Sequence, residues 1–390
     1  MAKTIVFCAD GTWNGPGKDD AQGAEPKGND TNVYKLFLAL AGGLSTGSIR
    51  EADEQEKVLV VNGATTQVTK YIHGVGDSRN PIFKLMGGAF GAGTISRIVR
   101  GYTYISRNYE PGDAIVITGF SRGAYTARAL AGLIAGEGLL AKPLAANGTE
   151  EERANAYRNG ARAWYRYRDR SNAMSNNPFK RFAEVMADLP AFVSSSELID
   201  SDLVPVASLK SVAVWDTVGA LGLPSYDKDH RTDAFRFTNN TLSPKVEKGL
   251  HAIALDEQRN DFTPSLWDAA ANVEQCAFAG AHADVGGGYP LAGNESGLSD
   301  ISLKWMVEKL QAQGVSFVLP LPASVVPNVC GTAHKPWLHA PFNLPGAACA
   351  RALAGQGVQV HPSVQQRMQA GPVVAEPGEA VSAYQPANLP

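Results

Sequence analysis

The sequence has little net charge and no long apolar run. Its 390 residues include 35 Lys and Arg against 38 Asp and Glu, which gives a formal net charge of -3. This balance excludes the strongly basic surface of a DNA- or RNA-binding protein, so we expect no nucleic-acid partner. No stretch approaches the roughly 18 apolar residues of a membrane-spanning helix. The apolar run before Asp10 is too short for the core of a signal peptide, which predicts a chain that is cytoplasmic when synthesised.

Cysteine is scarce, and charged residues make up only 19% of the chain. The four cysteines are Cys8, Cys276, Cys330 and Cys349, and no two of them form a CxxC pair. This excludes a zinc knuckle and a dense disulfide framework. The hydrophobic content of 44% excludes a mostly disordered chain. The 40 glycines follow no collagen-like period and therefore indicate many sharp turns.

Short β-branched runs alternate with helical patterns along the chain. The predicted strands cover 4–8, 58–61, 68–72, 114–118, 211–215 and 275–279, and the main predicted helices begin near Thr94, Gly123 and Ser299. Such alternation is typical of a mainly parallel sheet flanked by helices, so we predict an α/β fold of the α/β-hydrolase type. We expect one catalytic domain over 1–345, with a mainly helical insertion at 140–208. Residues 346–390 are predicted to be an extended Pro/Gly/Ala-rich tail packed on the core.

The most informative motif is Gly119–Gly123 (GFSRG), a G-x-S-x-G between a predicted strand and a predicted helix. A strand-to-helix elbow needs small residues beside the serine, because the tight turn has no room for side chains. The strained turn presents the hydroxyl of Ser121 to a base and a substrate, which predicts a nucleophile. The alternative is a glycine-rich turn in which Ser121 merely caps the helix.

A nucleophilic serine needs a base that is oriented by an acid. In α/β-hydrolases these follow the serine in the order acid, then His, each at the carboxyl end of a strand. Asp216 follows the strand at 211–215 and His282 follows the strand at 275–279, so we predict a Ser121–Asp216–His282 triad. His251 is the second candidate base, although we expect it in a helix as a buried structural histidine. Asp284 is the second candidate acid, or a brace for the glycine-rich turn beside it.

The developing oxyanion needs backbone N–H donors. One is predicted at Arg122, at the start of the helix after the elbow. The second is expected from the loop after the first strand, at Gly11 or Thr12, with Asp10 supporting that loop. The alternative for this segment is an ordinary Asp-Gly turn. The chemistry requires no metal and no cofactor.

Five blocks of sequence, in this order, resemble a known family. They are FCADGTWN, TGFSRGAYTARALAGLI, AVWDTVGALGLP, HAIALDE and FAGAHADVGGGYP, and the ending YQPANLP is similar to that family as well. The family is the uncharacterised α/β-hydrolase-domain family that includes the catalytic domain of type VI secretion phospholipase effectors. Its triad carries over to Ser121, Asp216 and His282.

The resemblance implies a serine hydrolase acting on ester bonds of membrane phospholipids, with a glycerophospholipid as the expected substrate and A-type cleavage. It also implies export without a signal peptide, by type VI secretion, and an immunity or secretion partner if the protein is an effector. The alternatives are a general esterase or lipase on simpler esters, a serine peptidase or amidase, and a non-catalytic binding protein on a hydrolase scaffold.

The predicted insertion carries a stripe of arginines. Arg158, Arg162, Arg166 and Arg170 recur every fourth residue and so share one face of a helix. With the aromatic residues between them, they suggest a lid after the nucleophile helix that docks on an anionic membrane surface. The alternative is a solvated helix face that is paired with acids elsewhere in the chain.

Overall fold

The computed structural model of the chain describes residues 2–11, 29–45, 54–74, 89–141, 148–170, 198–218, 240–340, 342–343 and 348–390, with the backbone alone at 89–92. The helices, strands and contacts given below are those of these residues.

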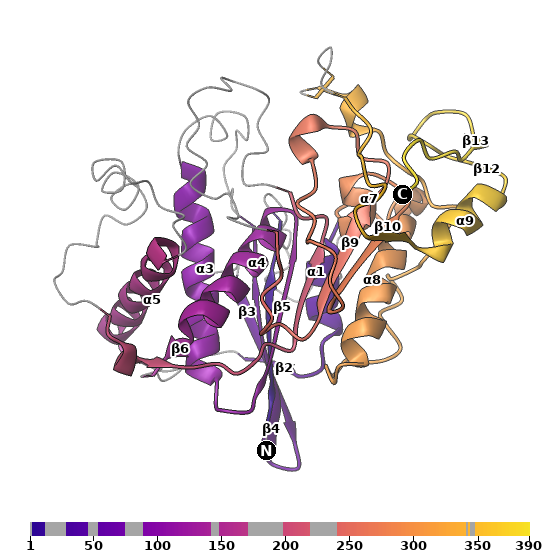
Figure 1. Cartoon of the computed structure of the whole chain (residues 1–390). Helices are drawn as coiled ribbons and strands as arrows, with labels where there is room; N and C mark the ends of the chain where they lie inside the picture. Colours follow the sequence, from indigo (N-terminus) through magenta and orange to yellow (C-terminus); the bar gives the residue numbers. More distant parts are fainter. Residues whose placement is uncertain are drawn as a thin grey trace.

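The described residues form one nine-stranded sheet in the order β11-β10-β9-β8-β5-β1-β4-β3-β2 (Figure 1). Its strands are β1 (Thr4–Ala9), β2 (Gly43–Leu44), β3 (Glu54–Val61), β4 (Ala64–Ile72), β5 (Ala114–Phe120), β8 (Ser211–Trp215), β9 (Gly249–Ala254), β10 (Val273–Phe278) and β11 (Val358–Val360). All neighbours are parallel except β3, which is antiparallel to both β2 and β4. The mainly parallel sheet flanked by helices confirms the predicted α/β fold.

Helices cover both faces of this sheet (Figure 1). One face carries α3 (Ala89–Asn108), α4 (Arg122–Glu137) and α5 (Glu150–Arg170), and the other carries α1 (Asn32–Ala39) and α8 (Gly297–Gln311). The short helix α7 (His282–Gly286) and α9 (Pro362–Gln369) lie near the C-terminus in the same view. Short 3-10 helices cover Asp200–Asp202, Asn260–Phe262, Ala292–Asn294 and Pro336–Leu338.

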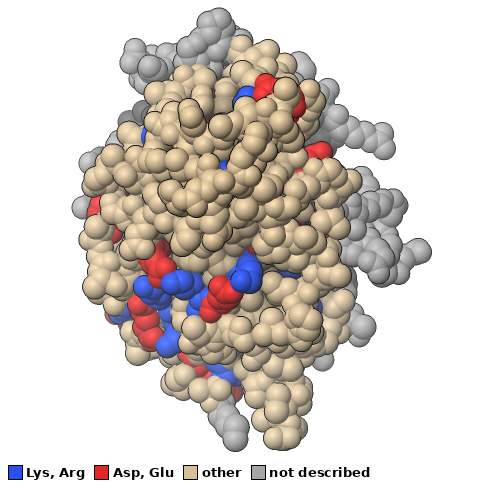
Figure 2. Space-filling model, turned by 90° about the vertical axis from the view of Figure 1, so that its right-hand side faces the viewer, with Lys and Arg blue, Asp and Glu red and all other residues tan. Residues whose placement is uncertain are grey.

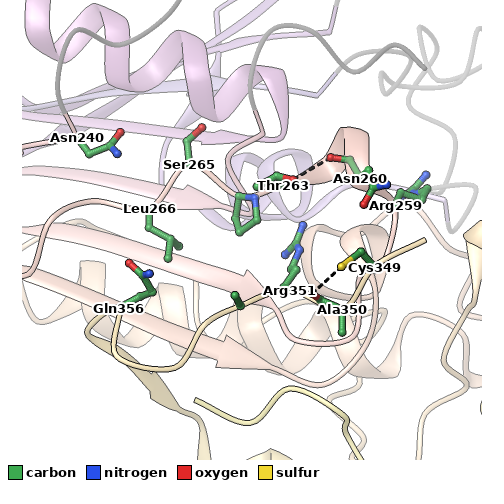
Figure 3. Close-up of a pocket in the computed structure, with 12 residues that line it drawn as sticks. Asn240, Arg259, Asn260, Thr263, Ser265, Leu266, Cys349, Ala350, Arg351 and Gln356 are labelled. Atoms are coloured by element: carbon green, nitrogen blue, oxygen red, sulfur yellow. Dashed lines mark hydrogen bonds between the residues drawn. The ribbon is translucent and has the colours of Figure 1, made fainter. Parts of the chain in front are cut away.

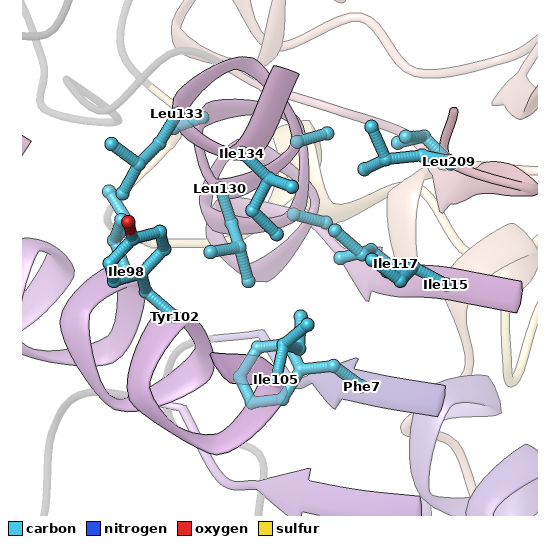
Figure 4. Close-up of a cluster of buried hydrophobic side chains, with 14 of the residues drawn as sticks. Phe7, Ile98, Tyr102, Ile105, Ile115, Ile117, Leu130, Leu133, Ile134 and Leu209 are labelled. Atoms are coloured by element: carbon cyan, nitrogen blue, oxygen red, sulfur yellow. The ribbon is translucent and has the colours of Figure 1, made fainter. Parts of the chain in front are cut away.

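The core is divided by the sheet into two layers. Side chains alternate along β1, so Phe7 packs under α3 and α4 with Ile117 and Leu130 (Figure 4). Cys8, the next residue, points to the other face, where Phe37 of α1 and Met306 of α8 cover it. Because a central strand of a parallel sheet is buried on both faces, its sequence reads as one continuous apolar run.

The helix α5 packs in the core layer that lies under α3 and α4. Trp164 is buried in that core, and a Cβ added at Gly160 would lie 3.0 Å from Val99 Cγ1 of α3. On α4, Gly132 and Gly136 leave room for the ring of Tyr167. This packing makes α5 part of the hydrophobic core, while the lid role of the insertion stays a prediction. Residues 171–197 of the predicted insertion lie outside the described residues.

The arginine stripe on α5 is paired in part with acidic residues. Arg166 Nε lies 2.8 Å from Glu137 Oε2 of α4, and Arg166 also pairs with Asp200. Arg170 Nη1 lies 3.2 Å from the same Glu137 oxygen. These pairs favour the alternative interpretation of the stripe, in which acids elsewhere in the chain neutralise its charge.

Two further expectations differ from the structure. The segment around His251 is strand β9, not a helix, because it lies between β8 and β10 and pairs with both. The C-terminal segment is more regular than its composition predicts, since β11 joins the sheet edge beside β10 and α9 follows it. Small antiparallel pairs join β12 (Pro372–Val373) to β13 (Ser382–Ala383) and β6 (Leu139–Leu140) to β7 (Leu203–Val204).

On the face that Figure 2 shows, Lys and Arg lie next to Asp and Glu and do not form a patch of one sign. Ion pairs also join Lys304 to Glu308 within α8, and Lys309 of α8 to Glu274 of β10. None of the helices among the described residues is both long enough and apolar enough to cross a membrane.

We expect Trp164→Ala to lower the free energy of unfolding by about 3–5 kcal/mol, because it removes a buried indole from the core between α3, α4 and α5. Denaturant unfolding followed by circular dichroism measures this change. Arg158→Gln, on the same helix, is the matched control and is expected to change stability little. Equal stability of the two variants would contradict the placement of α5 in the core.

Candidate active site

The elbow predicted from the G-x-S-x-G motif joins β5 to α4. Ser121 has φ 57° and ψ -123°, a conformation that a non-glycine residue adopts only under strain. Its N–H donates to the carbonyl of Trp215 at 3.1 Å, and its own carbonyl accepts from Tyr125 N–H at 3.2 Å. The first bond ties the elbow to the carboxyl end of β8. Strain of this kind persists only where the surroundings fix the backbone, which is typical of functional positions.

The two glycines of the motif are required by close backbone contacts. A Cβ added at Gly119 would lie 2.3 Å from the carbonyl oxygen of Gly123. A Cβ added at Gly123 would lie 2.1 Å from the carbonyl oxygen of Ala9 and 2.5 Å from that of Asp10. The elbow therefore packs directly on the end of β1, and side chains at either position would push it away.

Asp216 and His282 meet at the same edge of the sheet. Asp216 Oδ2 lies 2.6 Å from His282 Nδ1, although the two residues are 66 positions apart. Asp216 follows β8 with φ 35°, and its Oδ1 accepts from Ala254 N–H at 2.9 Å. His282 opens α7, after β10. Both side chains are buried. Of the two candidate acids, the structure brings Asp216 to His282.

The second candidate acid has another partner. Asp284 Oδ1 lies 2.7 Å from His334 Nδ1, and its Oδ2 accepts from the backbone N–H of Ala281 and of His334. His334 in turn stacks on the ring of Tyr289, with centroids 3.5 Å apart. Asp284 thus braces the turn that carries His282, which is the alternative role that its position in the sequence allowed.

Arg351, which the sequence did not single out, completes the surroundings of Asp216. Its Nη1 lies 2.6 Å from Asp216 Oδ1 and its Nη2 lies 2.9 Å from Oδ2, a two-pronged contact. The same guanidinium donates to the carbonyls of Ala254 and Phe262. Arg351 comes from the C-terminal segment, 135 positions from Asp216, in a stretch with no motif to mark it.

These contacts set the charges of the pair. Burial alone raises the pKa of Asp216, but the Arg351 guanidinium and hydrogen bonds from His282 and Arg351 outweigh it, so the pKa lies far below its ordinary value. Burial lowers the pKa of His282, against the opposing hydrogen bond and charge of Asp216. At neutral pH the carboxyl is therefore ionised and the imidazole is neutral, which is the state that a general base needs.

Other groups fix the imidazole from its remaining sides. The ring of His282 lies 4.6 Å from that of Phe120 and 4.9 Å, edge to face, from that of Phe262, measured between centroids. Its backbone N–H donates to Glu257 Oε2 at 3.1 Å, and Glu257 pairs with Arg259. Among the hydrogen bonds of the described residues, none joins the hydroxyl of Ser121 to His282. It is Phe120, the residue before Ser121, that contacts the imidazole.

The predicted oxyanion donors are placed differently from one another. Arg122 is the first residue of α4, so its N–H lies at a helix N-terminus. The N–H of Gly11 donates to Asp10 Oδ1 at 2.7 Å in this structure, and Thr12 lies outside the described residues. The role of Gly11 and Thr12 as donors stays a prediction.

Asp10 holds the loop at the end of β1. Its carboxyl accepts from Tyr71 OH at 2.6 Å and from the hydroxyl of Thr31 at 2.8 Å and 2.9 Å. Burial raises the pKa of Asp10 to about 7, against those hydrogen bonds. Because the Asp10 carbonyl lies so close to Gly123, a change in this loop would reach the elbow.

His251, the second candidate base, is structural. It is fully buried in β9, where its Nε2 accepts from Thr217 N–H at 3.1 Å and its Nδ1 lies 3.4 Å from Gln275 Oε1. Burial lowers its pKa to about 3, so it stays neutral.

A cavity of about 450 Å³ is lined in part by Arg351, the residue that contacts Asp216 (Figure 3). Arg351 and Arg259 line it together with Asn240, Asn260, Thr263, Pro264, Ser265, Leu266, Cys349, Ala350, Ala352 and Gln356. The cavity therefore reaches the guanidinium that contacts Asp216. In the described part of the chain, no cluster of three or more His, Cys, Asp or Glu side chains is arranged to hold a metal ion.

A family model described as "T6SS, Phospholipase effector Tle1-like, catalytic domain" matches residues 3–309. The chain belongs to this Tle1-like family. The matched range includes Ser121, Asp216 and His282, and it ends before Arg351.

Individual relatives are distant. The uncharacterized protein YEL023C of Saccharomyces cerevisiae is 31% identical over 147 residues, which are 36% of this chain and 19% of that protein. A crystal structure of an uncharacterized protein from Pseudomonas aeruginosa matches 85% of this chain and 49% of its own, with 21% identity and a TM-score of 0.43. A structure of the Tle1 effector bound to the VgrG spike of the type 6 secretion system matches 75% and 52%, with 18% identity and a TM-score of 0.33. The chain thus spans about half the length of these two solved chains and about a fifth of the yeast protein.

We expect Gly123→Ala to distort the elbow, because the added methyl group would overlap the Ala9 carbonyl. Overpacking of this kind costs about 1–3 kcal/mol of stability. Denaturant unfolding measures that loss, and a fluorophosphonate probe measures whether Ser121 remains reactive. Gly43→Ala is the matched control, since no atom lies within 4 Å of its added Cβ. Unchanged probe labelling and stability in Gly123→Ala would refute the close packing of elbow and β1.

Proposed function

We propose that this chain is a serine hydrolase that cleaves carboxylic ester bonds of membrane phospholipids, with A-type specificity. The observation that carries the proposal is the 2.6 Å contact between Asp216 and His282, at the same edge of the sheet as the strained Ser121 elbow. Membership of the Tle1-like phospholipase effector family supports the lipid substrate.

In the proposed mechanism, Ser121 Oγ attacks the ester carbonyl while His282 Nε2 accepts the hydroxyl proton. His282 then gives that proton to the departing alcohol, which leaves an acyl group on Ser121. Water activated by the same imidazole releases the fatty acid. Asp216 holds Nδ1 protonated, so that Nε2 is the free acceptor, and it stabilises the imidazolium that forms. Since catalytic hydrogen bonds often tighten only with substrate, Ser121 and His282 are expected to approach on binding.

The N–H of Arg122 at the start of α4 is the first proposed donor to the oxyanion. The loop at Gly11 and Thr12 is the proposed source of the second. Because Asp10 engages the Gly11 N–H, either Thr12 supplies this donor or Gly11 exchanges Asp10 for the substrate. Each such donor lowers the barrier by about 3 kcal/mol.

The same family membership supports export through a type VI secretion system, with a secretion partner and an immunity protein. A VgrG spike is the partner of one solved Tle1 effector. For this chain these remain proposals, as does contact with a membrane surface.

We expect wild-type protein to release fatty acid from phospholipid vesicles with distinguishable sn-1 and sn-2 acyl chains, and Ser121→Ala to lose about 10⁴-fold or more of that rate. Ser363→Ala, in α9, is the matched control and should retain the wild-type rate. Mass spectrometry of the released chains measures the rate and the position of cleavage. Cleavage of short soluble esters alone would favour the general esterase. Absence of cleavage together with absence of fluorophosphonate labelling at Ser121 would favour a binding protein.

The pH dependence follows from the pKa values of the pair. The base must be neutral, so kcat/KM rises with pH as His282 loses its proton. Because burial lowers the pKa of His282, the midpoint of this rise is expected below about 6.5, the ordinary value for histidine. Asp216 stays ionised throughout, since its pKa is depressed. Hydrolysis of a soluble ester from about pH 4 to about pH 9 tests this, and a midpoint above about 6.5 would contradict it.

A further inference from the structure

We propose that Arg351 is a positioning residue for the reaction, which acts through Asp216 and makes the C-terminal segment a working part of the active site. This inference rests on the proposed function, because it concerns the acid of the same triad. The family model ends at residue 309, so Arg351 belongs to a part of the chain that the family match does not reach.

The geometry fixes Asp216 on three sides. Arg351 contacts both carboxylate oxygens, at 2.6 Å and 2.9 Å, and Ala254 N–H donates to Oδ1. The remaining contact of Oδ2 is with His282 Nδ1. A carboxylate held in this way cannot rotate about its Cβ–Cγ bond without breaking two charge-assisted hydrogen bonds. Arg351 therefore aims Oδ2 at the imidazole and, through it, orients His282.

Arg351 is itself immobilised by the protein. Its side chain is buried, and it donates to the carbonyls of Ala254 and Phe262 as well as to Asp216. Phe262 is also the residue whose ring packs edge to face on His282. The guanidinium thus links the end of β9, the ring against the imidazole and the catalytic acid in one network.

The charges around the imidazole are balanced in pairs. Asp216 is matched by Arg351, and Glu257, which accepts from the His282 backbone, is matched by Arg259. His251 lies nearby on β9 and stays neutral, and Arg128 of α4 acts on it electrostatically. Loss of Arg351 would leave one uncompensated negative charge beside His282. Such a charge stabilises the imidazolium, so the base would hold its proton to a higher pH.

The test compares Arg351→Met with wild type on a soluble ester. We expect kcat to fall by about 10²-fold with KM nearly unchanged, because orientation is lost and binding is not. The acid limb of the pH profile of kcat/KM should move upward by about 1 pH unit. The reason is that the uncompensated negative charge of Asp216 raises the pKa of the neighbouring His282 by that order. A folded Arg351→Met protein with wild-type kcat and an unmoved acid limb would overturn the proposal.

Arg367→Met is the matched control from the same C-terminal segment. Arg367 is fully buried on α9, and its guanidinium donates to the carbonyls of Val329, Gly331 and Val374, away from Asp216. Its loss should lower stability and leave the acid limb where it is in wild type. If Arg367→Met moves the acid limb as Arg351→Met does, Arg351 acts only by holding the segment in place, and the proposal fails.

Arg351→Lys keeps the test open if the methionine variant does not fold. Lysine retains the positive charge but cannot make the two-pronged contact with Asp216. We therefore expect an acid limb near the wild-type position and a reduced kcat. Guanidinium or ethylguanidinium added to Arg351→Ala is expected to restore activity, because the adjoining cavity gives access to the vacated position. A lysine variant indistinguishable from Arg367→Met, together with no rescue, would count against the positioning role.

An activity-independent measurement separates this inference from the proposed function. The short contact between Asp216 and His282 should give a downfield imidazole proton resonance in wild type, and its pH titration reports the pKa of His282 directly. The resonance should weaken or shift in Arg351→Met and stay in Ser121→Ala. If wild type cleaves no ester but the resonance responds in this way, the proposed function fails and the positioning role stands. If ester cleavage depends on Ser121 but the resonance is the same in wild type and Arg351→Met, the proposed function stands and the positioning role of Arg351 fails.

Discussion

The buried negative charge of Asp216 is the constraint on which the arrangement of the site depends. A carboxylate without solvent is costly unless it is paired and hydrogen-bonded. Here the compensation comes from three separate parts of the chain, namely Ala254 at the end of β9, His282 on α7 and Arg351 in the C-terminal segment. None of these partners is near Asp216 in sequence, so the charge is stable only when the whole fold is assembled. The pairing of Asp216, the proposed triad acid, therefore depends on the completed fold.

The parallel sheet explains why such distant residues meet. Carboxyl ends of parallel strands lie at one edge, so residues that follow β1, β5, β8, β9 and β10 are gathered there whatever their separation in sequence. Backbone contacts hold the gathered loops together, since Ser121 N–H donates to Trp215 and Asp216 N–H donates to Ala252. The close approach of Gly123 to Ala9 extends the same network to the loop that Asp10 holds. Small residues at the contacts let the loops meet without side chains between them.

The features that could be predicted from the sequence are those marked by strand ends and local motifs. The elbow at Ser121 and the positions of Asp216 and His282 followed from apolar runs that end in a polar residue. His251 was misplaced in a helix because a short apolar run flanked by charges does not reveal its period, and only pairing with β8 and β10 makes it a strand. The His334 partner of Asp284 and the Arg351 partner of Asp216 were invisible, because no local pattern records a contact across 50 or 135 positions.

The C-terminal segment contains few charged residues, yet it adds a strand to the sheet and buried arginines to the interior. Its composition predicts an extended covering, yet β11 continues the sheet beside β10. Two of its few charged side chains, Arg351 and Arg367, are buried with their Nη donors directed at oxygens. A buried guanidinium is unfavourable unless its donors are matched, so each arginine constrains where the backbone around it can lie. Arg367 donates to the carbonyls of Val329, Gly331 and Val374. The other is matched by Asp216, so the packing of this segment and the proposed orientation of His282 depend on the same two hydrogen bonds.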